Sequence, residues 1–487
     1  MGAAVSNWRL AQAVSRTGQL GVVSSVALDT ILSRRLQDGD PGGHMRRGLA
    51  LFPFPEMAGR ILSKHYNANG RAGAPYKLIP MLTRVNTREA TELTVAANFV
   101  EVILARQGHC NPVGINLMEK LQLPLLASLY GAMLAGVDYL LMGAGIPLKV
   151  PGALDAFAAG EPASYPLSVT GAQPEDDCMM TFDPRDFAGG EAPRLQRPMF
   201  LAIISSNALA TTMVRRANGK VDGFIIEGPT AGGHNAPPRG QMVLNERGEC
   251  VYGERDAVDM EKIRQIGLPF WLAGGYGTPG KINEALELGA TGVQVGTAFA
   301  LCEESGLRPD YKDTLIDKVL HGKEAVFTDP RSSPTGFPFK AAQLEGTTSE
   351  AAIYAKRKRI CDVGTLRQAY RTPEGRIAYR CSAELVDVYV SKGGALEDTE
   401  GRKCLCNSLL ADVGHQQIQK DSSEEPGLVT TGDDLSCALQ FLVPGATSYS
   451  ATDVVRHLTG SLPLLPLPTP VLVTVAEVAA QAVEAAS

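Results

Sequence analysis

A histidine that directly follows two glycines is the residue in this sequence best suited to acid/base chemistry. The short apolar run Phe224–Ile226 leads into a loop that contains Gly232, Gly233, His234 and Arg239. Glycines lack a Cβ, so the backbone there can approach a ligand closely, and an imidazole exchanges a proton near neutral pH. The loop therefore predicts a proton-transfer group beside a bound ligand. The alternative is a surface histidine without a chemical role.

Two later segments have the residue types that bind phosphate. In residues 270–280 and 292–300, a short apolar run ends in glycines, and helical sequence follows. A strand, a glycine turn and a helix N-terminus together present free backbone N–H groups and the positive end of a helix dipole. In a (β/α)8 barrel the phosphate site commonly lies after strands seven and eight. The segments therefore predict a phosphate site, unless their glycines only shape turns.

Strand-like and helix-like segments alternate through the first two thirds of the chain. Alternation of this kind predicts a parallel sheet with helices on its faces. The expected strands cover residues 20–24, 77–82, 113–117, 139–142, 199–206 and 224–226 and the runs that begin at 270 and 293. The expected helices cover residues 8–16, with Ser6 as N-cap, and 92–106, 125–136, 151–160, 208–218, 256–266, 279–289 and 310–320. About eight parallel strands predict an α/β fold, a TIM (β/α)8 barrel.

Domain organisation follows from where the alternation stops. We expect the barrel to span residues 1–325, with a hairpin-like insertion at about 161–195. Residues 327–339 are rich in Pro and Ser and predict a loop, and no further alternation follows it. Residues 326–487 should therefore form a mixed C-terminal extension packed on the barrel. Its Pro/Leu-rich stretch 462–470 and the tail from about 460 onward suggest a flexible end or a terminal helix.

Charge and hydropathy exclude several classes of protein. The 487 residues carry a formal net charge of −6 at pH 7, which does not suggest a nucleic-acid-binding surface. No apolar run is long enough to cross a bilayer, and the start of the chain lacks the basic-then-apolar order of a signal peptide. Nine scattered cysteines suggest reduced thiols. We therefore expect a soluble cytoplasmic protein without a membrane partner.

Four cysteines of the extension are of the residue type that binds zinc. Thiolates and an imidazole can hold zinc in a tetrahedral site. The spacing here lacks paired Cys-x-x-Cys units, so buried free thiols are the favoured interpretation and no metal is predicted. The residues concerned are Cys361, Cys381, Cys404 and Cys406, with His415 nearby.

Six short motifs, kept in order from about residue 2 to about residue 325, together resemble one enzyme family. They are Gly114-Ile-Asn116, Gly143-Ala-Gly-Ile-Pro147, Glu227-Gly-Pro-Thr-Ala-Gly-Gly-His234, Ala273-Gly-Gly275, Gly289-Ala-Thr-Gly-Val-Gln-Val-Gly-Thr297 and Cys302-Glu-Glu-Ser305. The combination resembles the nitronate monooxygenases, also called 2-nitropropane dioxygenases, and their relatives the flavin-dependent enoyl-acyl-carrier-protein reductases. Family members usually begin with a strand that ends in a glycine turn, of which Met1-Gly2 remains here. Either residues 77–82 fill that wall position or the barrel lacks it.

The resemblance implies an FMN-binding barrel and assigns roles to particular residues. His234 would be the catalytic acid/base beside the flavin, with Gly232 and Gly233 along the isoalloxazine ring. The loop after His234 departs from the family's pattern and carries Arg239, which would pair with an anionic substrate group or else be a solvated loop charge. The FMN phosphate would be held by Gly274, Gly275, Gly296 and Thr297, and further flavin contacts would come from Asn116, Gly143 and Gln294.

The activity implied is that of an FMN-dependent oxidoreductase. A nitronate monooxygenase-like enzyme would oxidise an alkyl nitronate or a similar carbon acid, with O2 as the electron acceptor. One alternative is an NAD(P)H-dependent flavin enzyme that reduces an enoyl thioester. Another, from a different class, is a non-catalytic scaffold that binds flavin or phosphate. In each enzymatic case the partner is a small-molecule substrate, and a homo-oligomer stays open.

Overall fold

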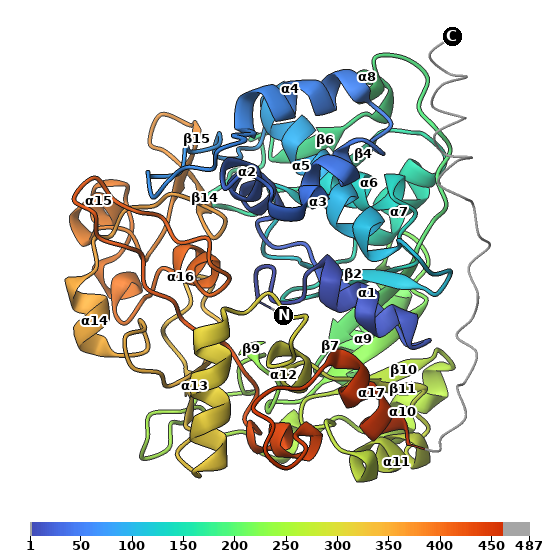
Figure 1. Cartoon of the computed structure of the whole chain (residues 1–487). Coiled ribbons are helices and arrows are strands. Elements are labelled where there is room, and N and C mark those ends of the chain that lie inside the picture. The colour runs from blue at the N-terminus through green and yellow to red at the C-terminus, as the bar shows by residue number, and fades with distance from the viewer. Residues whose placement is uncertain (1, 461–487) are drawn as a thin grey trace.

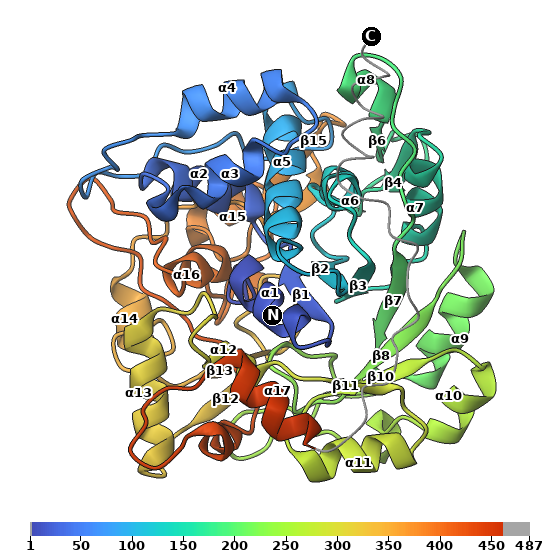
Figure 2. The ribbon, with the colours of Figure 1, turned by 45° about the vertical axis from the view of Figure 1, so that its right-hand side comes forward.

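A seven-stranded parallel sheet forms the centre of the protein, in a computed structural model that describes residues 2–460. Its strand order is β1-β2-β3-β7-β8-β10-β11, and every neighbouring pair is parallel. Figures 1 and 2 show the sheet curling from β1 round to β11. The strands are β1 (Gly21–Ser24), β2 (Val113–Met118), β3 (Tyr139–Gly143), β7 (Met199–Ile204), β8 (Gly223–Glu227), β10 (Phe270–Ala273) and β11 (Gly292–Gln294).

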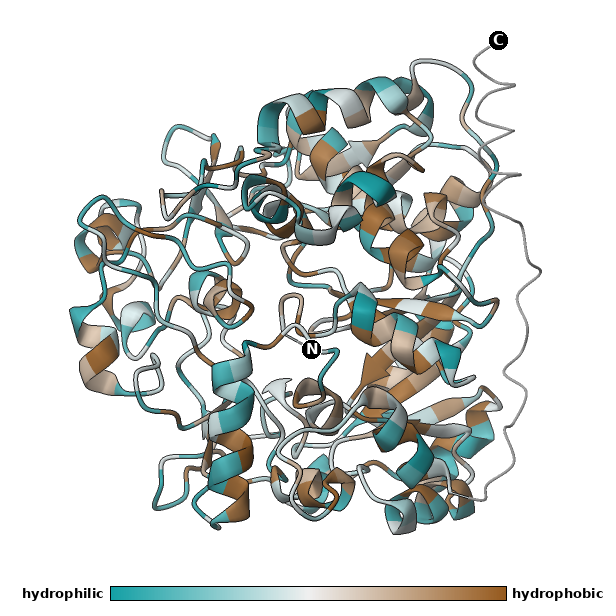
Figure 3. Cartoon of the chain, in the orientation of Figure 1, coloured by the Kyte–Doolittle hydropathy of each residue, from teal (hydrophilic) through white to brown (hydrophobic). Residues whose placement is uncertain are grey.

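Alternation of side chains along the strands gives the curled sheet two apolar faces. In β8, Phe224 and Ile226 join the large core between sheet and helices. Ile225 points the other way, into a smaller cluster on the concave side. Successive residues of a strand face opposite sides, so a strand buried on both faces reads as a continuous apolar run. The strands are accordingly among the most hydrophobic parts of the ribbon in Figure 3.

Helices cover the convex side of the sheet. Thr87 caps α5, and the side chains of this helix are buried nearly all round because α1, α2, α3 and α6 all contact it. The helices are α1 (Trp8–Arg16), α2 (Leu28–Gln37), α3 (His44–Leu49), α4 (Pro55–His65), α5 (Arg88–Ala105), α6 (Leu125–Leu134), α7 (Val150–Ala158), α8 (Pro184–Ala188), α9 (Asn207–Arg216), α10 (Met260–Ile266), α11 (Pro279–Glu287), α12 (Thr297–Ala300), α13 (Pro309–Leu320), α14 (Ala351–Lys356), α15 (Val386–Ser391), α16 (Leu405–Ala411) and α17 (Ala451–Thr459).

The strand expected at residues 77–82 is wrong. This stretch has no regular secondary structure, and side chains from distant elements bind the backbone at its start. The Lys77 amide donates to Gln37 Oε1 at 2.8 Å, and the amide of Tyr76 donates to Gln417 Oε1 at 2.8 Å. Among residues 2–460 the parallel sheet therefore has seven strands where about eight were expected.

The first helix matches its predicted bounds, but its N-cap is Asn7 and not Ser6. The Asn7 side chain accepts hydrogen bonds from the amides of Arg9 and Leu10. Ser6 instead donates to the Val22 carbonyl at 2.5 Å, which ties the start of the chain to β1.

The hairpin-like pairing expected near residues 164–193 is present, as β4 (Ala163–Pro166) pairs antiparallel with β6 (Met179–Phe182).

The C-terminal part of the chain contains two small sheets and several short helices. β12 (Val326–Asp329) and β13 (Phe339–Ala342) pair antiparallel, so the loop expected at residues 327–339 in fact ends in strands. β13 also pairs with β9 (Gly233–His234). The second sheet joins β14 (Gln368–Arg371) to β15 (Ile377–Arg380) and to β5 (Val169–Thr170). In both sheets, residues beyond 330 are hydrogen-bonded directly to earlier parts of the chain.

The part of the chain that the structure describes contains no helix long and apolar enough to cross a membrane. The expectations for residues 462–470 and for the tail lie outside the described residues.

We predict that Gly131→Ala destabilises the protein. Gly131 lies where α6 crosses α5, and a Cβ there would overlap the Val95 carbonyl group. Overpacking of this kind costs about 1–3 kcal/mol or more, because one helix must move. The matched control is Gly59→Ala in α4, where no atom lies within 4 Å of the added carbon and the better helix propensity should stabilise. Thermal unfolding should show a lower Tm for the first variant only, and equal Tm values would contradict the packing.

Candidate active site

Glycine turns follow the last three strands of the sheet and meet at one rim. Gly274 and Gly275, which follow β10, have φ of 91° and 78°, a region that favours glycine. A Cβ on Gly274 would lie 3.0 Å from Thr230 Oγ1 and 3.1 Å from the Ala231 amide nitrogen, in the turn after β8. Because the two turns pack backbone against backbone, the site needs glycine at position 274 for both space and conformation.

Two adjoining cavities open at this rim. The larger, of about 570 Å³, is lined by the turns after β8, β10 and β11. The smaller, of about 110 Å³, lies towards β2 and β3. Both are lined by Glu227, Gly232 and Gln294, so they meet at the end of β8.

The structure brings all but one of the predicted site residues to these two cavities. The smaller cavity is lined by Asn116, Gly143, Gly232, Gly233, His234 and Gln294. The larger cavity is lined by Gly232, Gly274, Gly275, Gln294, Gly296 and Thr297. The glycine turns and the histidine, which are separate in the sequence, therefore lie at one place in the fold.

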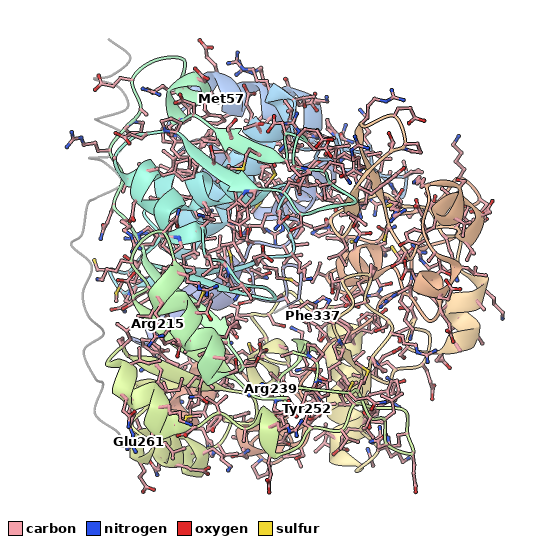
Figure 4. All side chains as sticks on the ribbon, turned by 180° about the vertical axis from the view of Figure 1, so that it is seen from behind. Met57, Arg215, Arg239, Tyr252, Glu261 and Phe337 are labelled. Carbon is pink, nitrogen blue, oxygen red and sulfur yellow. The ribbon has the colours of Figure 1, made fainter. Side chains whose placement is uncertain are left out.

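His234 is held by residues that follow the sheet in the sequence. Its Nε2 is hydrogen-bonded to Ser333 Oγ at 2.6 Å, and its ring packs edge-on against Phe339 with centroids 4.9 Å apart. The ring of Phe337, labelled in Figure 4, is 6.4 Å away. Burial is the main cause that lowers the pKa of His234 to about 3. The imidazole is therefore neutral near pH 7.

Glu227 is a candidate site residue to which the sequence analysis assigned no role. It is the last residue of β8 and lies two residues after Ile225. Alternate residues of a strand share a face, so its side chain faces the concave side of the sheet. Burial raises the pKa of this carboxyl group to about 7. The sequence signal was available, because a carboxylate at the carboxyl end of a barrel strand faces the usual place of an active site.

Arg239 is the predicted site residue that lies elsewhere. It lines neither cavity. Its guanidinium donates to the backbone carbonyls of Arg255 and Ser205, both at 2.6 Å, and its amide donates to Asp256. Figure 4 shows Arg239 on the rear of the molecule, in the same region as Tyr252. These bonds give the side chain a structural role in its loop.

The cysteines of the extension are free thiols in the structure. Burial raises the pKa of Cys361, and of Cys404 to about 11 and Cys381 to about 12, so the thiols are protonated near pH 7. His415 Nδ1 lies 3.4 Å from Asp38 Oδ2. Within residues 2–460 no group of three or more His, Cys, Asp or Glu side chains is arranged to hold a metal ion.

Comparison with known proteins identifies the segment that carries most of these turns. Residues 192–330 match the family model described as nitronate monooxygenase. This segment is similar to the nitronate monooxygenases. The match includes β7, β8, β10 and β11, His234 and the glycine turns, and it ends before Ser333 and β13.

Two curated relatives match over short stretches. A nitronate monooxygenase of Pseudomonas aeruginosa is 40% identical over 94 residues, which is 19% of this chain and 25% of the relative. A probable nitronate monooxygenase of Bacillus subtilis is 34% identical over 114 residues, 22% of this chain and 31% of the relative. The matched stretches thus span about a third or less of these relatives. Among solved structures, FabK from Thermotoga maritima is 16% identical with a TM-score of 0.43, covering 93% of this chain and 88% of that one.

We predict that Glu227 makes the stability of the protein fall as pH rises. A carboxyl group whose pKa rises from 4.5 to about 7 on folding favours the folded state below pH 4.5, and this contribution is lost as pH increases through 7. Glu227→Gln should therefore raise Tm relative to the unaltered protein more at pH 8 than at pH 5. Exposed Glu56→Gln is the matched control. A Tm difference for Glu227→Gln that is the same at both pH values would contradict the assignment.

Proposed function

We propose that the protein is an FMN-dependent oxidoreductase of the nitronate monooxygenase type. In this proposal residues 1–325 form a TIM barrel of which the curled sheet is most of the wall, and residues 326–487 are an extension that completes its site. One observation carries the proposal. The glycine turns after β8, β10 and β11 and a neutral His234 line two cavities that meet at the end of β8.

The residues present fit a flavin nucleotide. Gln294 Oε1 is buried and has no hydrogen-bond partner among residues 2–460, although it lines both cavities. An unpaired buried polar atom is costly, so a ligand group is its natural partner. The glycines at 274, 275 and 296 leave backbone N–H groups free to face a phosphate in the larger cavity. Bound here, FMN would supply the electron acceptor that the protein's own side chains lack.

The side chains around the smaller cavity can move a proton. A neutral His234 can accept a proton from a carbon acid, and its bond to Ser333 fixes the ring's orientation. Glu227 has a pKa of about 7 and can therefore be present in either form at neutral pH. Phe337 and Phe339 cover the imidazole and keep water from it. A small carbon acid, or the alkyl nitronate that forms when a nitroalkane loses its α-proton, is the substrate class that this arrangement suits, with O2 as the final acceptor.

Rapid mixing distinguishes this function from its alternatives. Purified protein loaded with FMN is mixed without oxygen with propionate-3-nitronate, and separately with NADPH, while flavin absorbance is followed. Bleaching by the nitronate alone supports the proposal. Bleaching by NADPH alone would replace it with an enoyl-thioester reductase, and inertness to both would indicate a binding scaffold.

We predict that His234→Gln retains FMN but loses most of its turnover. Loss of a positioned acid/base typically reduces the rate by about 10²–10⁴-fold. The control is His109→Gln, since His109 lies outside both cavities and bonds to the Ala105 carbonyl at the end of α5. Flavin content by absorbance and kcat with the nitronate are measured for each. Unchanged kcat in His234→Gln would remove the histidine from the mechanism.

A further inference from the structure

A segment of the C-terminal extension, Thr430–Asp433, crosses the rim of the larger cavity. Its backbone is fixed to the turns after β8 and β11. The Gly432 amide donates to Thr297 Oγ1 at 2.8 Å, and the Asp433 amide donates to the Thr230 carbonyl at 3.1 Å. Residues more than 130 positions apart in the sequence are therefore held together at the proposed phosphate end of the site.

The crossing is a contact of backbone against backbone. A Cβ on Gly232 would lie 2.6 Å from the Thr431 carbonyl carbon. A Cβ on Gly432 would lie 2.9 Å from Thr297 Oγ1 and 3.0 Å from the Thr230 carbonyl oxygen. A side chain at position 232 would overlap backbone atoms, and one at position 432 would fit only if its neighbours moved. The segment is thus part of the cavity wall and does not merely pass near it.

One buried hydroxyl on this wall has no hydrogen-bond partner among residues 2–460. Thr431 is 3% exposed and lines the larger cavity, yet its hydroxyl has no hydrogen-bond partner among residues 2–460. Burying a hydroxyl without a partner costs free energy, so such groups usually meet a ligand or water. The Thr297 hydroxyl accepts its bond from Gly432, which leaves its own proton free to donate.

The described lining of the larger cavity contains no Lys, Arg or His, and it contains the acidic residues Glu227 and Asp434. A phosphate there would depend on uncharged donors, namely backbone N–H groups and hydroxyls.

We propose that the Thr431 hydroxyl donates a hydrogen bond to the phosphate of the flavin nucleotide, so that the extension supplies part of the phosphate site. This inference rests on the proposed function, and it adds a contact from beyond residue 330. The Gly432 amide acts alongside it by orienting the Thr297 hydroxyl towards the same group.

The test compares a flavin that has the phosphate with one that lacks it. Flavin is removed from the full chain, and the Kd values of FMN and riboflavin are measured by fluorescence quenching. Thr431→Val keeps the shape of the side chain and removes the hydroxyl. It should weaken FMN binding by roughly tenfold or more and leave riboflavin binding unchanged, since only FMN offers the phosphate acceptor. Thr431→Ser should restore FMN affinity.

Two controls separate a ligand contact from a structural role. Thr399→Val alters a buried threonine of the extension whose hydroxyl bonds to the Leu396 carbonyl and which lines neither cavity, and it should not change the Kd of FMN. Apoprotein Tm should be unchanged or higher in Thr431→Val, because an unpaired hydroxyl is lost. The inference is overturned if Thr431→Val binds FMN like the unaltered protein, or if FMN and riboflavin weaken equally. If the unaltered protein binds neither flavin, the proposed function fails with it.

Discussion

The antiparallel pairing of β9 with β13 is the interaction on which the candidate chemistry depends. It places Phe339 opposite His234 and Lys340 opposite Gly233. A loop histidine would otherwise sample many rotamers, but here the pairing, the bond to Ser333 and the aromatic contacts fix the ring. The same contacts remove it from water, and this makes its neutral form the stable one. The same contacts thus determine both the position of the His234 ring and its protonation state.

Burial acts in opposite directions on the two ionisable groups of the site. It lowers the pKa of the His234 imidazolium and raises that of the Glu227 carboxyl, because each charged form loses its hydration. At neutral pH the His234 imidazole is therefore in its neutral form and can accept a proton, whereas the Glu227 carboxyl group is present in both its protonated and ionised forms. The surroundings of these two groups push their pKa values apart. One group can therefore accept a proton at the same pH at which the other can donate one.

Sequence reasoning succeeded where the pattern is local. Continuous apolar runs ending in glycine located β8, β10 and β11, because a strand buried on both faces leaves a distinct run of residues. It failed at residues 77–82, where the backbone at the start of the run, at Tyr76 and Lys77, is bound by the side chains of Gln417 and Gln37 from distant elements. The sequence also did not predict that Ser333 and Thr431 lie at the site. The residues that they contact lie about 100 to 200 positions away, and no spacing in the sequence indicates such a contact.

The residues of the site come from distant stretches of the chain, and this sets the order in which the site can form during synthesis. The wall of the larger cavity requires Gly432 against Thr297, and the histidine requires Ser333 and Phe339. A ribosome makes the chain from its N-terminus, so the curled sheet can form while both of these supports are still unsynthesised. Between the synthesis of β11 and that of Gly432, the nascent chain therefore has a sheet but no complete site, and any chemistry must wait until the later residues have emerged and docked.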